Sequence, residues 1–309
     1  MLAEKYRPKN LNEIVGQPLV VSQLKNLIET KRFPHLLFIG PPGCGKTSTA
    51  YAFANEIGYP VVEMNASDER GIQTIREKVK RIAFSSGNRI ILLDEMDNMT
   101  FDAQQALRRI MERSAEGVVF ILTGNHEWKI VDAIKSRCAI FRFRKLDEKD
   151  IAKVLIKVLK AEKITVTSET FKALMRLIKI TDGDLRRTLN ELETIITKTG
   201  TISIESVELL VKPNLALQSL ESLFNGNWED SLKKLEDAVV LSENPNEIVN
   251  IFYKSIEKLN LPLLTKLKIY DRLSTAESAI KIGCDPVIQL AGFLASIWAY
   301  IHTQKPTRG

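Results

Sequence analysis

The sequence predicts an α/β core built on a parallel sheet, followed by two helical regions. Between residues 34 and 143 short apolar runs alternate with helical patterns, which is typical of parallel strands joined by crossover helices. After Lys145 the strand pattern ends, and apolar residues recur at spacings of three and four, as in amphipathic helices. We therefore expect a core over residues 1–146, a small helical lid over 147–212 and an all-helical domain over 213–309.

The predicted strands of the core are five apolar runs. They are HLLFIG (35–40), PVVEMN (60–65), RIILLDE (89–95), VVFILTG (118–124) and IFRF (140–143). RIILLDE and VVFILTG lack the alternation of a half-buried strand, which indicates that helices cover both faces of the sheet. Helical patterns fill the intervals, beginning with GKTSTAYAFANEIG at 45–58.

The rest of the chain contains only helical patterns. In the lid they cover residues 147–163, 168–200 and 203–211. Pro213 marks a boundary, after which we expect four helices separated by Asn, Pro and Gly, over 217–243, 245–259, 262–283 and 285–302.

Composition narrows the class of protein. No apolar run approaches the roughly 18 residues of a membrane-spanning helix, and the N-terminus lacks the apolar stretch of a secretory signal. We therefore expect an intracellular protein without a membrane partner. The three cysteines are far apart, which predicts neither a disulfide framework nor a zinc site. A net charge of +6 is compatible with an anionic partner.

The sequence GPPGCGKT (40–47) stands between the first predicted strand and a helix, where a phosphate-binding loop belongs. Glycines let backbone N–H groups close around phosphate oxygens, and the helix adds the positive end of its dipole. We expect Lys46 to reach the β- and γ-phosphates of ATP and Thr47 to bind Mg²⁺. The alternative, a chance glycine-rich turn, does not explain this context. The predicted loop comprises Gly40, Pro41, Pro42, Gly43, Cys44, Gly45, Lys46, Thr47 and Ser48.

Two acids end the strand RIILLDE. Asp94 is predicted to hold Mg²⁺, and Glu95 to polarise a water for attack on the γ-phosphate, which favours hydrolysis over simple binding. The alternative is that both are solvated acids that cap the next helix.

Asn125 follows the strand VVFILTG. Residues at the carboxyl ends of parallel strands line the ligand crevice, so its amide is placed to contact the attacking water or the γ-phosphate. A residue that only caps or turns the chain is the alternative. For His126 and Trp128 packing or surface exposure is favoured.

Several segments together resemble the AAA+ ATPases and, among them, the small subunits of replication factor C, the sliding-clamp loaders of archaea and eukaryotes. NASDERGI and AQQALRRIME are the most specific of these segments, and the resemblance covers nearly the whole chain. The segments are EKYRPKNLNEIVGQ (4–17), LLFIGPPGCGKTSTA (36–50), NASDERGI (65–72), LLDEMDNMTFDAQQALRRIME (92–112), SRC (136–138), GDLRR (183–187) and IQLAGFLASI (288–297).

The resemblance implies an AAA+ P-loop core, a helical lid and a helical collar for oligomerisation. It also implies an ATP hydrolase that loads a sliding clamp onto primer–template DNA, with other clamp-loader subunits, both small and large, as partners.

The resemblance implies roles for further residues. Ala3, Arg7 and Val15 would line the adenine and ribose pocket. Asn125 would sense the γ-phosphate, and Arg186 on the lid would be a second sensor. Arg137 would be an arginine finger that acts on ATP held by the neighbouring subunit; without the family pattern, a surface cation is the equal alternative.

The resemblance also implies contacts with other macromolecules. Arg76, Lys80 and Arg81 would follow the DNA backbone without reading its sequence. The alternative is an ordinary solvated helix face. Ile110 and Met111 would either contact the clamp or belong to the core.

The chain departs from the family pattern at a few positions. Cys44 replaces a threonine, with little expected effect, and DEMDNM differs from the commoner DEADSM at positions expected to face solvent.

Two rival functions stay open: a ring helicase or remodeller, for which no aromatic pore loop is evident, and a scaffold subunit that binds ATP without hydrolysing it. Intact Lys46, Asp94 and Glu95 argue against the scaffold.

Overall fold

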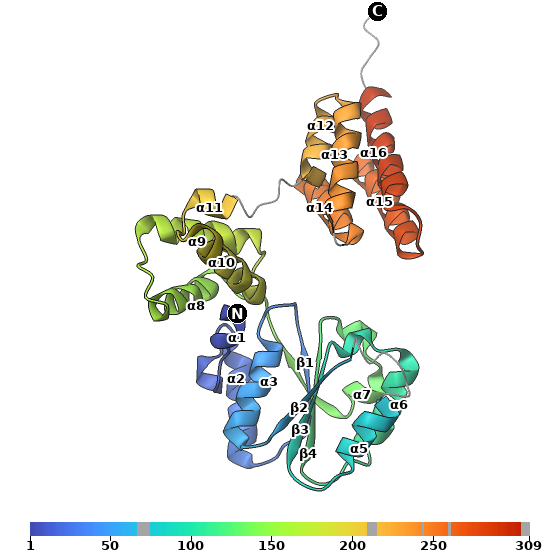
Figure 1. Cartoon of the computed structure of the whole chain (residues 1–309). Helices are drawn as coiled ribbons and strands as arrows, with labels where there is room; N and C mark the ends of the chain where they lie inside the picture. Colours follow the sequence, from blue (N-terminus) through green and yellow to red (C-terminus); the bar gives the residue numbers. More distant parts are fainter. Residues whose placement is uncertain (67–74, 209–214, 243, 259–260, 304–309) are drawn as a thin grey trace, which may run out of the picture. The chain divides into compact units, whose positions relative to one another are not determined.

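The chain divides into two compact units, Met1–Leu210 and Val211–Gly309 (Figure 1). The computed structural model describes residues 1–66, 75–208, 215–242, 244–258 and 261–303. The expected core and lid both belong to the first unit, so their division at residue 146 stays a prediction. Among the described residues, no helix combines the length and apolarity needed to cross a membrane.

Within the described residues, five parallel strands of the first unit form one sheet in the order β2-β3-β4-β1-β5. All five predicted strands are confirmed, and only the last is displaced, since it begins at Cys138 rather than Ile140. Their bounds are β1 (His35–Ile39), β2 (Val61–Asn65), β3 (Arg89–Asp94), β4 (Val118–Gly124) and β5 (Cys138–Arg142). Because the strands are parallel, the residues that follow β1, β3 and β4 meet at one edge of the sheet.

Helices cover both faces of this sheet, as the continuous apolar runs predict (Figure 1). Helices α2 (Pro18–Thr30) and α3 (Lys46–Ile57) pack on one face, where Leu24 and Phe53 belong to the same buried cluster as Phe38. The opposite face carries α5 (Lys80–Ala83), α6 (Phe101–Met111) and α7 (Asp132–Lys135). Alternate residues of each strand therefore enter two different cores.

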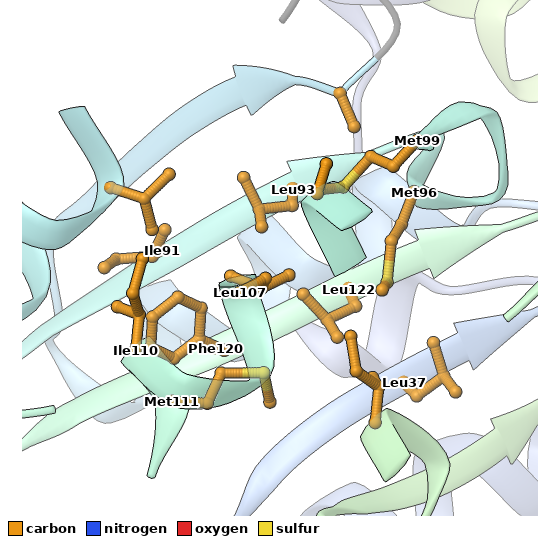
Figure 2. Close-up of a cluster of buried hydrophobic side chains, with 14 of the residues drawn as sticks. Leu37, Ile91, Leu93, Met96, Met99, Leu107, Ile110, Met111, Phe120 and Leu122 are labelled. Carbon is orange, nitrogen blue, oxygen red and sulfur yellow. The ribbon is translucent and has the colours of Figure 1, made fainter. Parts of the chain in front are cut away.

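Figure 2 shows the core beneath α6. Ile110 and Met111 point into it with exposed fractions of 5% and 3%, so in this chain both are core residues. Met96 is fully buried in the same cluster, on the side of Met99 and Leu122, which contradicts the expectation that its position faces solvent; Asn98 is exposed as expected. Met96 anchors the turn after β3 to the core, and this turn carries the acidic residues of the site.

The lid packs on the N-terminal segment of the chain. Leu2 in α1 (Leu2–Lys5) is buried in the lid's cluster, and its N–H donates to Glu193 Oε2 at 2.9 Å. Tyr6 donates from its hydroxyl to Glu162 Oε1 at 2.6 Å. Residues before the sheet thus connect the lid to the core. The lid helices are α8 (Glu148–Ala161), α9 (Ser168–Ile180), α10 (Leu185–Thr199) and α11 (Ile204–Glu208).

The described part of the second unit contains five helices, so the expectation of four is wrong. Residues 217–243, predicted as one helix, are interrupted after Phe224. Gly226 has a φ of 82°, which ends the first helix in the left-handed region, and the Asn227 side chain caps the next helix by accepting from Asp230 N–H at 3.1 Å. The helices are α12 (Leu215–Phe224), α13 (Trp228–Leu241), α14 (Pro245–Lys258), α15 (Leu263–Lys281) and α16 (Pro286–Thr303).

Candidate nucleotide-binding and hydrolysis site

A cavity of about 430 Å³ lies where the N-terminal segment, the loop after β1, the ends of β2 and β3, and the lid meet. Most of the residues predicted to bind nucleotide line it together. They are Ala3, Arg7, Val15, Gly43, Cys44, Gly45, Lys46, Thr47, Ser48, Asp94, Glu95 and Arg186. The volume is in the range of small-molecule sites.

The loop between β1 and α3 needs its glycines. Gly43 and Gly45 have φ values of 66° and 99°, in the left-handed region that other residues rarely adopt. The N–H of Gly40 donates to Gly124 O at 3.2 Å, which fixes the start of the loop to the end of β4. Helix α3 begins at Lys46, so its first N–H groups, which lack partners within the helix, lie beside the cavity.

Lys46 is 8% exposed and makes close polar contacts. Its ammonium donates to Gly40 O at 2.7 Å, to Pro41 O at 2.8 Å and to Asn125 Oδ1 at 2.8 Å. Burial lowers the pKa of Lys46, because desolvation disfavours the charged form. These acceptors hold the ammonium at the base of the phosphate loop, and they place the Asn125 amide beside it. Pro42 is exposed.

Thr47 and Asp94, which the sequence predicts as Mg²⁺ ligands, lie within hydrogen-bond distance of each other. The Thr47 hydroxyl donates to Asp94 Oδ2 at 3.1 Å, and Thr123 Oγ1 also donates to the Asp94 carboxylate. A hydroxyl and a carboxylate are the ligand types that Mg²⁺ prefers. The donor set therefore fits this ion.

Glu95 follows Asp94 with a φ of 56°, a left-handed conformation that is uncommon for this residue type. Its N–H donates to Thr123 Oγ1 at 3.2 Å, and Asn98 Nδ2 donates to its carboxylate at 3.2 Å. The side chain is exposed where it lines the cavity. The turn thus directs a solvated carboxylate to the site, as a water-polarising base requires.

Tyr6 and Arg7 of the N-terminal segment also line the cavity, and Tyr51 contacts Arg7 without lining the cavity itself. The Arg7 guanidinium lies 5.2 Å from the centre of the Tyr51 ring, within cation–π range. Desolvation and a hydrogen bond to Glu63 raise the pKa of Tyr51 to about 12, so this phenol stays protonated at neutral pH. Leu185 and Leu189 of the lid add apolar wall. Such surroundings suit a flat ring system better than a phosphate.

Comparison with known proteins shows the family. The family model described as "ATPase family associated with various cellular activities (AAA)" matches residues 36–146, and "Replication factor C C-terminal domain" matches residues 211–296. The replication factor C small subunit of Staphylothermus marinus is 38% identical, over 96% of this chain and 93% of its own. The chain belongs to the replication factor C small subunits. It is an AAA+ ATPase subunit of a clamp loader in DNA replication.

Two further relatives and a solved structure agree. The replication factor C small subunit of Sulfolobus acidocaldarius is 38% identical, over 99% of this chain and 98% of its own. Replication factor C subunit 3 of Schizosaccharomyces pombe is 36% identical, over 95% of this chain and 89% of its own. The RuvB Holliday junction branch migration motor of Thermotoga maritima has a TM-score of 0.58 at 15% identity, over 93% of this chain and 87% of that one. At that identity it shows a shared fold alone.

Arg137 of this replication factor C small subunit lies outside the walls of its own chain's cavity. Its guanidinium donates to Ala133 O at 2.7 Å and forms an ion pair with Glu112 at the end of α6. Glu112 also accepts from Arg108 Nε at 3.0 Å. These two arginines lower the pKa of Glu112, Arg108 more strongly than Arg137. Glu112 therefore stays ionised and holds Arg137, the predicted arginine finger.

The predicted DNA contacts are described only in part. Lys80 and Arg81 in α5 are exposed. Arg76 belongs to the π-helical segment η2 (Ile75–Val79), but its side chain is outside the described residues. Most of NASDERGI, from Ser67 to Ile72, is outside them as well.

Sequence reasoning missed three polar residues that organise the site. Thr123 connects Asp94 and Glu95, and Asp97 contacts Asn125. Gln17 is 3% exposed and donates to Arg144 O at 2.7 Å and to Cys44 O at 3.3 Å, so it supports the phosphate loop from behind. The signal for Thr123 was its position two residues before Asn125, at the end of the same strand. For Gln17 no local signal exists, because its partners are distant in sequence.

Proposed function

We propose that this clamp-loader subunit binds ATP with Mg²⁺ in the cavity between phosphate loop and lid, and that hydrolysis there drives the loading of a sliding clamp onto primer–template DNA. The observation that carries the proposal is the convergence of the Lys46 ammonium, the Asn125 amide and the Thr47–Asp94 pair at one edge of the sheet. These groups come from three different strand ends, so their meeting is a property of the fold.

Each residue has a distinct task. Lys46 and the N–H groups at the start of α3 bind phosphate oxygens, and Thr47 with Asp94 holds Mg²⁺, which neutralises charge on the triphosphate. Glu95 accepts a proton from the attacking water while Asn125 orients that water or the γ-phosphate. Arg186 extends from the lid into the same cavity and binds phosphate, which couples the nucleotide to the position of the lid.

Arg137 completes the site of a neighbouring subunit. It lines no part of its own chain's cavity, and it forms an ion pair with Glu112 at the C-terminal end of α6. A cation supplied by the next subunit stabilises the charge that develops at the γ-phosphate. Hydrolysis then depends on assembly with other small subunits and a large subunit.

The remaining parts serve assembly and DNA binding. The exposed Lys80 and Arg81, together with Arg76, contact the phosphate backbone. Residues 213–309 form the collar that holds subunits together, and residues 147–212 act as the lid. The protein works inside the cell.

The test is turnover of ATP in the assembled complex with partner subunits, sliding clamp and primed DNA. We expect strong stimulation over the isolated chain, and loss of it with Lys46→Ala. Lys149→Ala is the matched control, because Lys149 is exposed and removed from the cavity. Equal turnover by the Lys46→Ala and Lys149→Ala complexes would contradict the proposal.

A further inference from the structure

Asp97 is an almost buried carboxylate beside the hydrolysis site. It lies in η3 (Met96–Asn98), directly after Glu95, and is 6% exposed. Its oxygens accept from Asn125 N–H at 3.2 Å, from His126 N–H at 3.2 Å and from His126 Nδ1 at 3.0 Å. Burying a charge is costly unless such donors surround it, so these hydrogen bonds tie the turn that contains Asp97 to the end of β4.

The end of β4 is shaped to admit this carboxylate. Gly124 precedes Asn125, and a Cβ at Gly124 would lie 3.2 Å from Asp97 Oδ1 and 3.3 Å from Ile130 Cδ1. A larger residue would push these groups apart. The absence of a side chain at Gly124 therefore lets Asp97 approach the Asn125 backbone closely.

Asn125 connects Asp97 to Lys46, the predicted catalytic lysine. The backbone N–H of Asn125 donates to Asp97, and the Asn125 side chain accepts from Lys46 at 2.8 Å. On its other side Asp97 holds His126, whose ring makes an edge contact with Trp128 at 5.9 Å between centres. Trp128 is 77% exposed. Asp97 thus lies between the γ-phosphate end of the site and an exposed aromatic residue.

We propose that Asp97 is a positioning residue for ATP hydrolysis: it fixes the backbone at Asn125 and His126, so that the Asn125 amide meets Lys46 and the γ-phosphate in one orientation. This inference rests on the proposed function of the cavity. Asp97 does not line the nucleotide cavity, and its oxygens accept from Asn125 and His126 at the end of β4. A role limited to stabilising the fold would lower stability without any specific dependence on Asn125.

The decisive experiment is a double-mutant cycle between Asp97→Asn and Asn125→Ala, read as single-turnover hydrolysis in the assembled complex with clamp and primed DNA. Asp97→Asn replaces an acceptor oxygen with an amide group that cannot accept from His126. We expect hydrolysis to fall roughly 10- to 100-fold, with nucleotide affinity little changed, because a small misplacement of a catalytic group has effects of this size. The double variant should be no slower than Asn125→Ala alone, because the two residues act as a unit.

Controls separate this inference from the underlying function and from misfolding. Asp102→Asn, at an exposed aspartate on the first turn of α6, should leave basal hydrolysis unchanged. If Asp97→Asn does not fold, His126→Ala enters the same cycle, since it removes the exposed ring donor to Asp97 and leaves the buried carboxylate in place. Independent, multiplying effects of Asp97 and Asn125 would overturn the positioning role. Undiminished hydrolysis by Lys46→Ala would instead overturn the proposed function.

Discussion

Gly43 of the phosphate loop lies directly against Asp184 of the lid, so closely that a Cβ on Gly43 would be 1.9 Å from Asp184 Oδ1. The same Oδ1 accepts from Arg187 N–H at 2.9 Å and caps α10, the helix that carries Arg186. The lid therefore contacts the phosphate loop through Asp184, the N-cap of α10. We therefore expect a change in the loop on nucleotide binding to reach the lid at this contact.

Gly43→Ala should weaken nucleotide binding about tenfold or more, because the added methyl group forces the lid away and the residue must hold a φ of 66°. Binding of a fluorescent ATP analogue to the isolated chain measures the effect. Gly58→Ala is the control, since Gly58 has a similar φ of 72° at the end of α3 with no atom within 4 Å of its added Cβ. Equal affinity of the Gly43→Ala chain and the unsubstituted chain would show that the loop and the lid are independent.

Arg137→Ala should lower ATP hydrolysis by the assembled complex and leave ATP binding by the isolated chain unchanged. Loss of an arginine finger costs roughly 10³-fold or more in turnover, so the assembled complex should lose most of its activity. The isolated chain should bind ATP as before and lose little stability, because the ion pair with Glu112 is partly exposed and screened by solvent.

Mixing supplies the control for Arg137. Subunits with a normal finger should rescue sites next to them in a complex that contains Arg137→Ala, whereas they should not rescue the site of a Lys46→Ala chain. If Arg137→Ala instead weakened ATP binding by its own chain, the finger would act within its own subunit.

His35 makes stability depend on pH. Its Nδ1 accepts from Phe120 N–H at 3.2 Å and its Nε2 lies 3.3 Å from Met111 O, so the ring is neutral with the proton on Nε2. Burial lowers the pKa of His35 below its ordinary value of 6.5. The unfolded chain thus binds more protons between these two pKa values, and stability present above about pH 6.5 is lost as the pH falls through that window.

Urea unfolding at pH 7.5 and at lower pH measures this dependence. His35→Asn keeps an acceptor for Phe120 N–H and should cost about 1 kcal/mol at pH 7.5, whereas His35→Phe leaves that N–H without an acceptor and should cost more. Both variants should flatten the pH dependence, because neither side chain titrates. An undiminished slope in both would assign the acid sensitivity to other groups.

The strands and the phosphate loop could be predicted because their signals are local. A strand buried on both faces is a continuous apolar run, and GPPGCGKT needs only the strand before it and the helix after it. Asp97 could not be predicted in this way. Its burial depends on the left-handed turn at Glu95 and on the approach of Gly124 from another strand, and neither leaves a pattern around residue 97.

The buried Met96 and the break between α12 and α13 were misjudged for a related reason. A methionine between charged residues looks solvent-facing, although the turn directs it into the core. Apolar spacing continues on both sides of Asn225–Gly226–Asn227, so periodicity alone favours one long helix, whereas the left-handed Gly226 and the Asn227 cap break it into two helices that share one core.

Gly226 and Gly292 should respond oppositely to the same substitution. An added Cβ meets no atom within 4 Å at either position, so backbone conformation alone decides the outcome. Gly226 has a φ of 82°, and Gly226→Ala should destabilise the chain by about 1 kcal/mol, because a side chain disfavours the left-handed region. Gly292 lies within helix α16, so Gly292→Ala should stabilise by roughly 0.5–1 kcal/mol. Urea unfolding of the isolated chain compares the two, with Gly226→Asn expected between them, since asparagine tolerates positive φ better than alanine. A stabilising Gly226→Ala would mean that α12 and α13 can join into the single helix that the apolar spacing predicts.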